Sequence, residues 1–156
     1  MNPEELMRNA IELAEANVRA GRGGPFAAIV VKDGNLIAEG TNLVTSTNDP
    51  TAHAEVIAIR RACAVLGDFQ LTGCELYTSC EPCPMCLGAI YWARPSRIVY
   101  GAFHSDAAGA GFDDQFIYEE LDKPREQRHI PMYQLLRDEA DAVFQEWIAL
   151  EKRILY

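Results

Sequence analysis

Two stretches decide the fold of this chain: Thr51-Ala-His-Ala-Glu55 and Ser79-Cys-Glu-Pro-Cys-Pro-Met-Cys-Leu-Gly-Ala-Ile90. Each leads from a polar loop into an apolar run with helical spacing. The first helix is predicted to cover roughly Thr51 to Leu66, with Asp49 as its cap and Pro50 as its first residue. The second is predicted to open at Pro82 or Pro84 and to end near Ala93. Helix N-termini stabilise negative charge, so both stretches are suited to hold ionised side chains.

Three side chains in these stretches form a ligand set for zinc. His53, Cys83 and Cys86 supply one nitrogen and two sulfurs, which leaves the fourth tetrahedral position open for water, as a catalytic zinc site requires. Glu55 is not needed as a ligand, so it is free to take a proton from that water and pass it on. His53 and Glu55 are two residues apart and share a site only off the helix N-terminus. We therefore predict one zinc ion per chain, held where two helix N-termini meet.

The cysteines allow two other interpretations. Cys80, Cys83 and Cys86 have the spacing that begins a ferredoxin cluster, but no fourth cysteine follows them. Alternatively, His53 is an ordinary core histidine and the two later cysteines are a redox pair. The joint occurrence of a helix start, His, Glu, a strand and Pro-Cys-x-x-Cys favours the catalytic metal site.

The remaining elements extend this centre to a whole fold. An N-terminal helix is capped by Asn2, a hairpin turns at Asp33-Gly34-Asn35, and a Gly/Ala/Asp-rich loop precedes a short helix near residues 116–121. Strands are expected at 26–32, 36–40, 74–79 and 96–101, a fifth at Ile130 to Leu136, and a last helix at Asp138 to Arg153. This order predicts an α/β fold, a three-layer α/β/α sandwich with a central mixed five-stranded sheet, in a single domain spanning 1–156.

Composition narrows the partners and the compartment. The formal net charge of −9 disfavours a polynucleotide partner, and no apolar run approaches the roughly 20 residues that span a bilayer. The start Met-Asn-Pro-Glu-Glu lacks the features of a secretory signal. Five cysteines, three of them within seven residues, suit metal ligation in a reducing compartment better than a disulfide framework. We expect a cytoplasmic protein.

The motifs together point to a family. H-x-E followed by P-C-x-x-C is the signature of zinc-dependent nucleobase deaminases. Along nearly its whole length the chain resembles the cytidine deaminase-like superfamily, and within it the bacterial guanine deaminases. The segments that carry the narrower resemblance are Gly23-Gly-Pro-Phe26, Asn48 to Glu55, Tyr77 to Arg94, Asp106-Ala-Ala, Gly111 to Tyr118 and the terminal Tyr156.

This resemblance implies the hydrolytic deamination of guanine to xanthine and ammonia by a zinc-activated water, with Glu55 as the proton shuttle. By similarity, Asn42 would hydrogen-bond the base, and Asp114 would be a second catalytic residue that reads or protonates its amino side. Further substrate contacts would come from the backbone of Ala54 and Cys83 and from the rings of Phe26, Trp92 and Tyr156.

Alternatives to this function stay open at this point. The same zinc motif occurs in tRNA adenosine deaminases and in deaminases of other small aminated bases, although the acidic last helix is poorly suited to bind RNA. A non-catalytic zinc protein would have no need of Glu55. We expect a small purine base as the partner, with no nucleic acid and no membrane. A homodimer is also expected, in which the C-terminal segment contributes to the partner's site.

Overall fold

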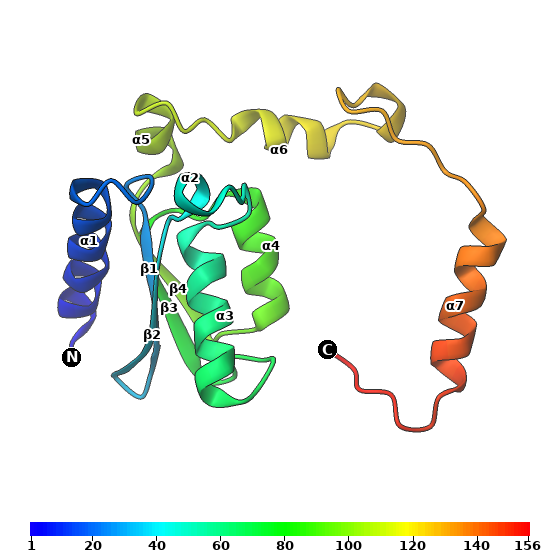
Figure 1. Cartoon of the computed structure of the whole chain (residues 1–156), viewed down its shortest axis with the longest axis horizontal. Helices are drawn as coiled ribbons and strands as arrows, with labels where there is room; N and C mark the ends of the chain where they lie inside the picture. Colours follow the sequence, from blue (N-terminus) through cyan, green and yellow to red (C-terminus); the bar gives the residue numbers. More distant parts are fainter. The chain divides into compact units, whose positions relative to one another are not determined.

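In the computed structural model, which describes residues 1–156, the chain forms two units, Met1–Asp114 and Gln115–Tyr156. The first is built on one mixed sheet with the strand order β2-β1-β3-β4 (Figure 1). Strand β1 is antiparallel to β2 and β3, whereas β3 and β4 are parallel. The strands are β1 (Ala27–Lys32), β2 (Asn35–Thr41), β3 (Cys74–Cys80) and β4 (Arg97–Ala102).

The hairpin between β1 and β2 forms at the predicted turn. Asp33 and Gly34 both have positive φ, 51° and 74°. A two-residue turn of this kind matches the twist of the flanking strands, and Asp and Gly tolerate it better than other residues do. The turn therefore fixes the register that pairs Lys32 with Asn35.

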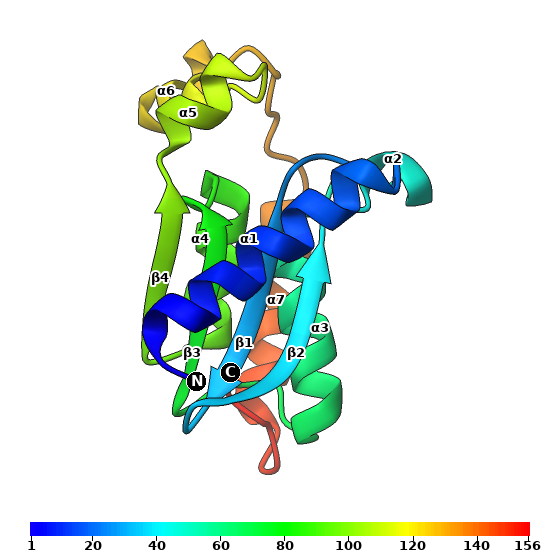
Figure 2. The ribbon, with the colours of Figure 1, turned by 90° about the vertical axis from the view of Figure 1, so that its left-hand side faces the viewer.

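Helix α1 (Pro3–Arg19) covers one face of the sheet, crossing its strands in Figure 2. The Asn2 side chain and Glu5 form a reciprocal capping box at its start. Buried apolar residues join the helix to the sheet, namely Leu6, Ala10, Ile29, Val31 and Tyr77.

Helices α3 (Ala54–Leu66) and α4 (Pro84–Ala93) cover the opposite face. Small residues let α3 lie directly against β2. A Cβ added at Gly40 would be 2.2 Å from the carbonyl oxygen of Ala54 and 2.5 Å from the backbone nitrogen of Ala58. Gly40 thus sets how deeply the N-terminal end of α3 sits on the sheet.

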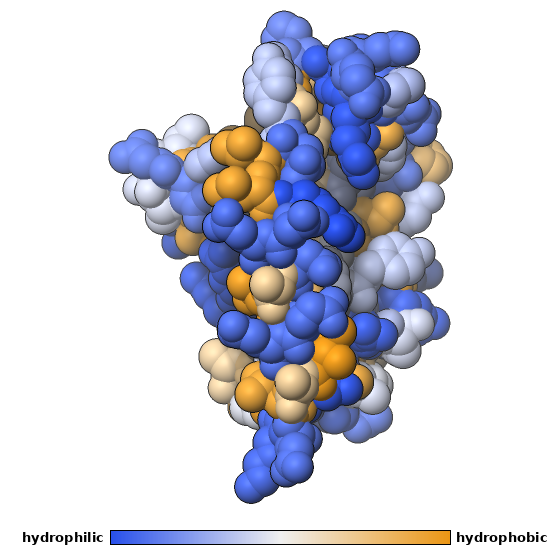
Figure 3. All heavy atoms as spheres, turned by 90° about the vertical axis from the view of Figure 1, so that its right-hand side faces the viewer, coloured by the Kyte–Doolittle hydropathy of each residue, from blue (hydrophilic) through white to orange (hydrophobic).

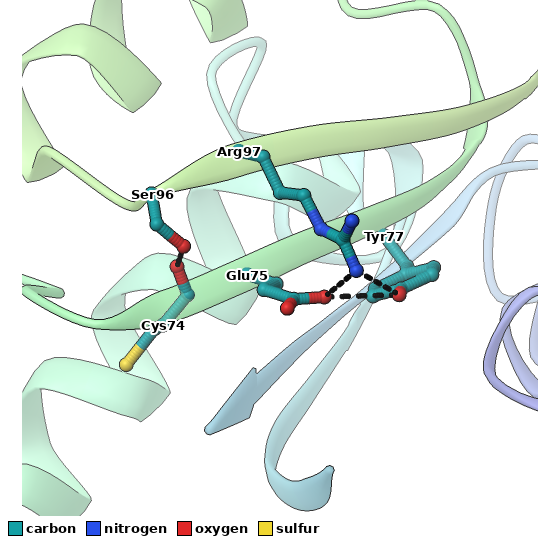
Figure 4. Close-up of polar contacts among 5 residues, drawn as sticks. All are labelled: Cys74, Glu75, Tyr77, Ser96 and Arg97. Carbon is teal, nitrogen blue, oxygen red and sulfur yellow. Dashed lines mark hydrogen bonds and ion pairs between the residues drawn. The ribbon is translucent and has the colours of Figure 1, made fainter. Parts of the chain in front are cut away.

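Polar contacts join the start of β3 to that of β4 (Figure 4). The guanidinium of Arg97 donates to Glu75 Oε2 at 2.8 Å, and the Tyr77 hydroxyl donates to the same oxygen at 3.0 Å. Next to them, the Ser96 hydroxyl donates to the carbonyl of Cys74. These contacts secure the register of the two parallel strands.

Three expectations about the first unit and the sheet are wrong. The sheet has four strands, because Ile130 to Leu136 pairs with no strand and Pro131 lacks the N–H that a ladder needs. Asp49 does not cap α3; its carboxylate accepts from the Thr51 backbone N–H at 2.8 Å and holds a turn instead. The expected loop after β4 contains a short helix, α5 (His104–Gly109), and another, α2 (Val44–Thr47), follows β2.

The second unit consists of α6 (Gln115–Asp122), a 3-10 turn (Arg125–Gln127) and α7 (Arg137–Ala149). The two predicted helices are therefore confirmed, although the last one ends at Ala149. Glu120 organises the connection by accepting from Arg128 through its carbonyl and from the His129 N–H through its carboxylate. No residue of this unit is buried. Among all the helices, none combines the length and apolarity needed to cross a bilayer.

Candidate active site

The candidate site lies at one end of the sheet of the first unit. Asn42 follows β2, Cys83 follows β3 and His104 follows β4, whereas Phe26 precedes the antiparallel β1. The strand directions therefore bring these four positions to the same edge. The crevice beyond the carboxyl ends of strands is where α/β sheets commonly bind ligands.

His53 and Cys83 are the N-cap residues of α3 and α4. The Nδ1 atom of His53 lies 3.5 Å from Cys83 Sγ and 3.4 Å from Cys86 Sγ, and the three ligand atoms are all within 4.8 Å of one another. Tetrahedral zinc with bonds of about 2.0 Å to nitrogen and 2.3 Å to sulfur separates the two atom types by about 3.5 Å. The predicted ligand group is thus confirmed as one that fits zinc.

The two thiols show why this group favours a cation. The pKa of Cys83 is lowered to about 4, first by a hydrogen bond from Cys86 and then by His53, whereas the same sharing raises the pKa of Cys86. One thiolate therefore forms readily, and its negative charge disfavours the ionisation of the second thiol beside it. The Cys86 N–H also approaches Cys83 Sγ at 3.5 Å, so the thiolate caps its own helix. A divalent cation would let both sulfurs ionise.

Glu55 lies in the first turn of α3 and is buried at 7% exposure. Burial raises the pKa of its carboxyl group, because the charged form is less well solvated there than in water. The protonated form is therefore favoured more than in an exposed glutamate. Its Oε1 accepts from the Thr78 hydroxyl at 3.4 Å. A buried carboxyl that is next to the ligand group and forms no ion pair is suited to exchange protons.

Asn42 is held by the glycine loop that precedes β1. Its Oδ1 accepts from the backbone N–H groups of Gly24 at 3.3 Å and Val44 at 3.2 Å. With the oxygen engaged twice, the Nδ2 end is the one left to donate. The carbonyl of Asn42 lies 2.1 Å from a Cβ added at Gly23, so only glycine permits this approach.

Phe26 and Asp114 are joined to the site by the loop after α5. Phe112 packs edge to face on Phe26, with the ring centroids 5.0 Å apart. Two residues later, Asp114 has a shielded Oδ1 that accepts no hydrogen bond. Burial raises the pKa of the Asp114 carboxyl, and the negative charge of Cys83 adds to the effect.

The other predicted site residues lie in different surroundings. Ala54 is the fully buried first residue of α3, so its N–H is one of those at the helix N-terminus. Trp92 is exposed in the last turn of α4, about 9 Å along the helix axis from Cys86. Tyr156 is exposed at the end of the second unit. The structure does not bring the Trp92 side chain together with the ligand group.

Sequence reasoning missed two buried polar residues that support the site. Thr78 donates to the carbonyl of Cys80 at 3.0 Å as well as contacting Glu55. Asn17, fully buried on α1, donates to the carbonyls of Gly24 and Asn42 at 3.0 and 2.9 Å. A polar residue on the apolar face of an otherwise amphipathic helix was the available signal for Asn17; Thr78, within a strand, gave none.

Cys80 is not part of the ligand group. Its thiol approaches the carbonyl of Phe103 at 3.7 Å. Burial, with the nearby carboxylates of Glu55, Glu81, Asp114 and Asp106, raises its pKa to about 11. Cys80 therefore stays a neutral thiol beside the metal ligands.

Comparisons with known proteins agree with this geometry. The family model of the cytidine and deoxycytidylate deaminase zinc-binding region matches residues 1–102. The chain is 63% identical to guanine deaminase from Bacillus subtilis over 94% of both sequences. The crystal structure of a guanine deaminase from that organism covers 100% of this chain and 99% of its own, with a TM-score of 0.97 and 60% identity.

More distant relatives include a purine-bound structure and a tRNA deaminase. A crystal structure in complex with 2,6-diaminopurine is 37% identical, with a TM-score of 0.68, and covers 99% of this chain and 86% of its own. The tRNA-specific adenosine deaminase of Haemophilus influenzae is 42% identical over 70% of this chain and 64% of its own. The chain therefore belongs to the cytidine and deoxycytidylate deaminase family, defined by its zinc-binding region.

Proposed function

We propose that this chain is a guanine deaminase, which hydrolyses guanine to xanthine and ammonia. The observation that carries the proposal is a three-ligand site with a buried carboxyl beside it, in a chain 63% identical to the Bacillus subtilis enzyme. A binding site for purines is also supported by the related structure that holds 2,6-diaminopurine. The reaction consumes one water, and its atoms balance with oxygen entering and ammonia leaving at C2.

His53, Cys83 and Cys86 would hold the zinc ion, and its chemistry would be to activate a water molecule as the nucleophile. Glu55 takes a proton from the attacking water and gives it to the ring nitrogen next to C2. It then takes the second proton from the hydroxyl group now on C2 and gives it to the amino group, which leaves as ammonia. Its raised pKa suits this exchange, because the carboxyl must bind the proton and release it again.

The base is oriented by the surrounding residues. Asn42 donates through Nδ2 to an acceptor on the base, and guanine offers O6 and N7 as acceptors, whereas the adenine amino group is a donor. Phe26 supplies an apolar wall for the ring, supported by Phe112. Asp114 receives the amino group of guanine through the carboxylate oxygen other than the shielded Oδ1. The N–H of Ala54 at the helix N-terminus binds a polar atom on the base edge.

We also propose a homodimer, because the second unit has no core of its own. Residues 115–156 include no buried side chain, and apolar patches reach the molecular surface (Figure 3). Such exposed apolar area is typical of an interface, and a second copy of the chain is the partner that is always present. In this assembly, residues 1–156 together form a single deaminase domain. The exposed apolar side chains of α7 are Val143, Phe144, Trp147 and Ile148.

The contacts of Trp92 and Tyr156 with the base stay predictions. Deleting Tyr156 tests its contact with the base. If Tyr156 closes the pocket, its removal should raise KM for guanine. We place the enzyme in the cytoplasm, because all five cysteines are free thiols and two of them serve the metal in reduced form.

A substrate panel tests the function directly. Purified zinc-loaded protein is given guanine, adenine, cytosine, cytidine and a tRNA anticodon hairpin, and ammonia release is measured. We expect activity on guanine and none on the hairpin. Activity on the hairpin alone would assign the chain to the tRNA adenosine deaminases instead.

A further inference from the structure

His104 faces a carboxylate oxygen in the site that accepts no hydrogen bond. The Oδ1 atom of Asp114 is shielded from solvent and accepts no hydrogen bond. His104 Nδ1 lies 4.0 Å from this oxygen, within the range of an ion pair but beyond that of a hydrogen bond. A side-chain rotation that moves either group by about 1 Å would make the bond.

The backbone of His104 is fixed to the loop that carries the cysteines. Its N–H donates to Glu81 Oε2 at 3.0 Å, and the N–H of Glu81 donates to the carbonyl of Ala102 at 2.8 Å. Glu81 is two residues before Cys83. Two hydrogen bonds therefore hold the backbone around His104 against the loop that carries the metal ligands.

Several carboxylates surround Asp114, so a hydrogen bond from an imidazole would stabilise its negative charge. Glu55, Glu81, Asp106 and Asp114 all lie close enough to Cys80 to disfavour its ionisation. A carboxylate in such a field is repelled by its neighbours and, without a donor, adopts the orientation that reduces this repulsion. A hydrogen bond from one fixed N–H group to Asp114 would instead determine how its carboxylate is oriented.

We infer that His104 is the positioning residue for Asp114, holding its carboxylate through Nδ1 so that the other oxygen meets the amino group of the bound purine. The inference rests on the proposed function and extends it to a residue that does not touch the substrate. Misplacing a substrate-binding group by 1 Å costs about 100-fold in rate, so loss of His104 is expected to weaken guanine use by roughly 10- to 100-fold.

Two substitutions separate positioning from a structural role. In His104→Asn the amide nitrogen occupies nearly the place of Nδ1, whereas in His104→Gln it reaches nearer to the place of Nε2. We expect His104→Gln to raise KM for guanine and to weaken binding of 8-azaguanine, measured by calorimetry, by 10- to 100-fold at unchanged zinc content. We expect His104→Asn to recover most of both. His129→Gln in the second unit is the matched control and should behave as wild type.

A double-mutant cycle completes the test. If His104 acts through Asp114, His104→Gln should cause almost no further loss in an Asp114→Ala background. Full additivity, or wild-type KM and 8-azaguanine affinity in His104→Gln, would overturn the inference while leaving guanine deamination intact. A wild-type protein that binds 8-azaguanine but does not turn over guanine would overturn the proposed function and this inference with it.

Discussion

Replacing Gly40 by alanine tests how closely the active-site helix must approach the sheet. The added Cβ would lie 2.2 Å from the Ala54 carbonyl oxygen, and ordinary contact begins near 3.4 Å, so α3 must move by about 1.2 Å. Both atoms that the Cβ meets most closely are backbone atoms of α3, in Ala54 and Ala58, which cannot rotate away. The displaced end of the helix carries His53 and Glu55.

The expected losses follow from that displacement. Overpacking of this kind costs about 1 to 3 kcal/mol in the free energy of unfolding, and a 1 Å misplacement of catalytic groups lowers turnover about 100-fold. Urea denaturation measures the first and guanine turnover at full zinc occupancy the second. Gly88→Ala in α4 is the matched control, because nothing lies within 4 Å of its added Cβ. It should gain up to about 1 kcal/mol. Gly40→Ala with wild-type stability and turnover would refute the reasoning.

Two smaller perturbations test the support of the site and of the sheet. Thr78→Val removes a buried donor to the Cys80 carbonyl and to Glu55, so we expect a loss of about 1 to 3 kcal/mol by urea denaturation, and an unchanged midpoint would contradict it. The hydrogen bond from Arg97 lowers the pKa of Glu75, so this contact stabilises the fold above the ordinary glutamate pKa of about 4.3 and loses that effect as the pH falls below it. In Glu75→Gln the free energy of unfolding should therefore fall slightly less as the pH is lowered through the acidic range. The difference should be well under 1 kcal/mol, because the pair is partly exposed. An acid dependence identical to that of the wild type would exclude this contribution.

Elements with local signals were predictable from the sequence. The capping box of Asn2 and Glu5 and the Asp33-Gly34 turn each involve residues within a few positions of one another. The same holds for Cys83, which caps α4 and is a metal ligand at once. His53 required the further argument that it shares a site with Glu55 only off a helix N-terminus, and the structure places it there as the N-cap.

Elements that depend on distant partners were not predictable in the same way. The apolar run near Ile130 suits a strand by composition, but a strand exists only where another edge pairs with it. Asp49 had the features of a helix cap, yet it bonds to Thr51, and α3 starts five residues later at Ala54. The approach of His104 to Asp114 depends on α5, whose small residues indicated a loop.

The proton transfer assigned to Glu55 is the central claim, and one variant tests it most directly. Glu55→Gln keeps the size of the side chain but removes its ability to carry a proton, so zinc content and folding should match the wild type. We predict that guanine turnover falls by about 10²- to 10⁴-fold, measured by xanthine formation with zinc at one ion per chain. Turnover within a few-fold of wild type, at full zinc occupancy, would contradict the account.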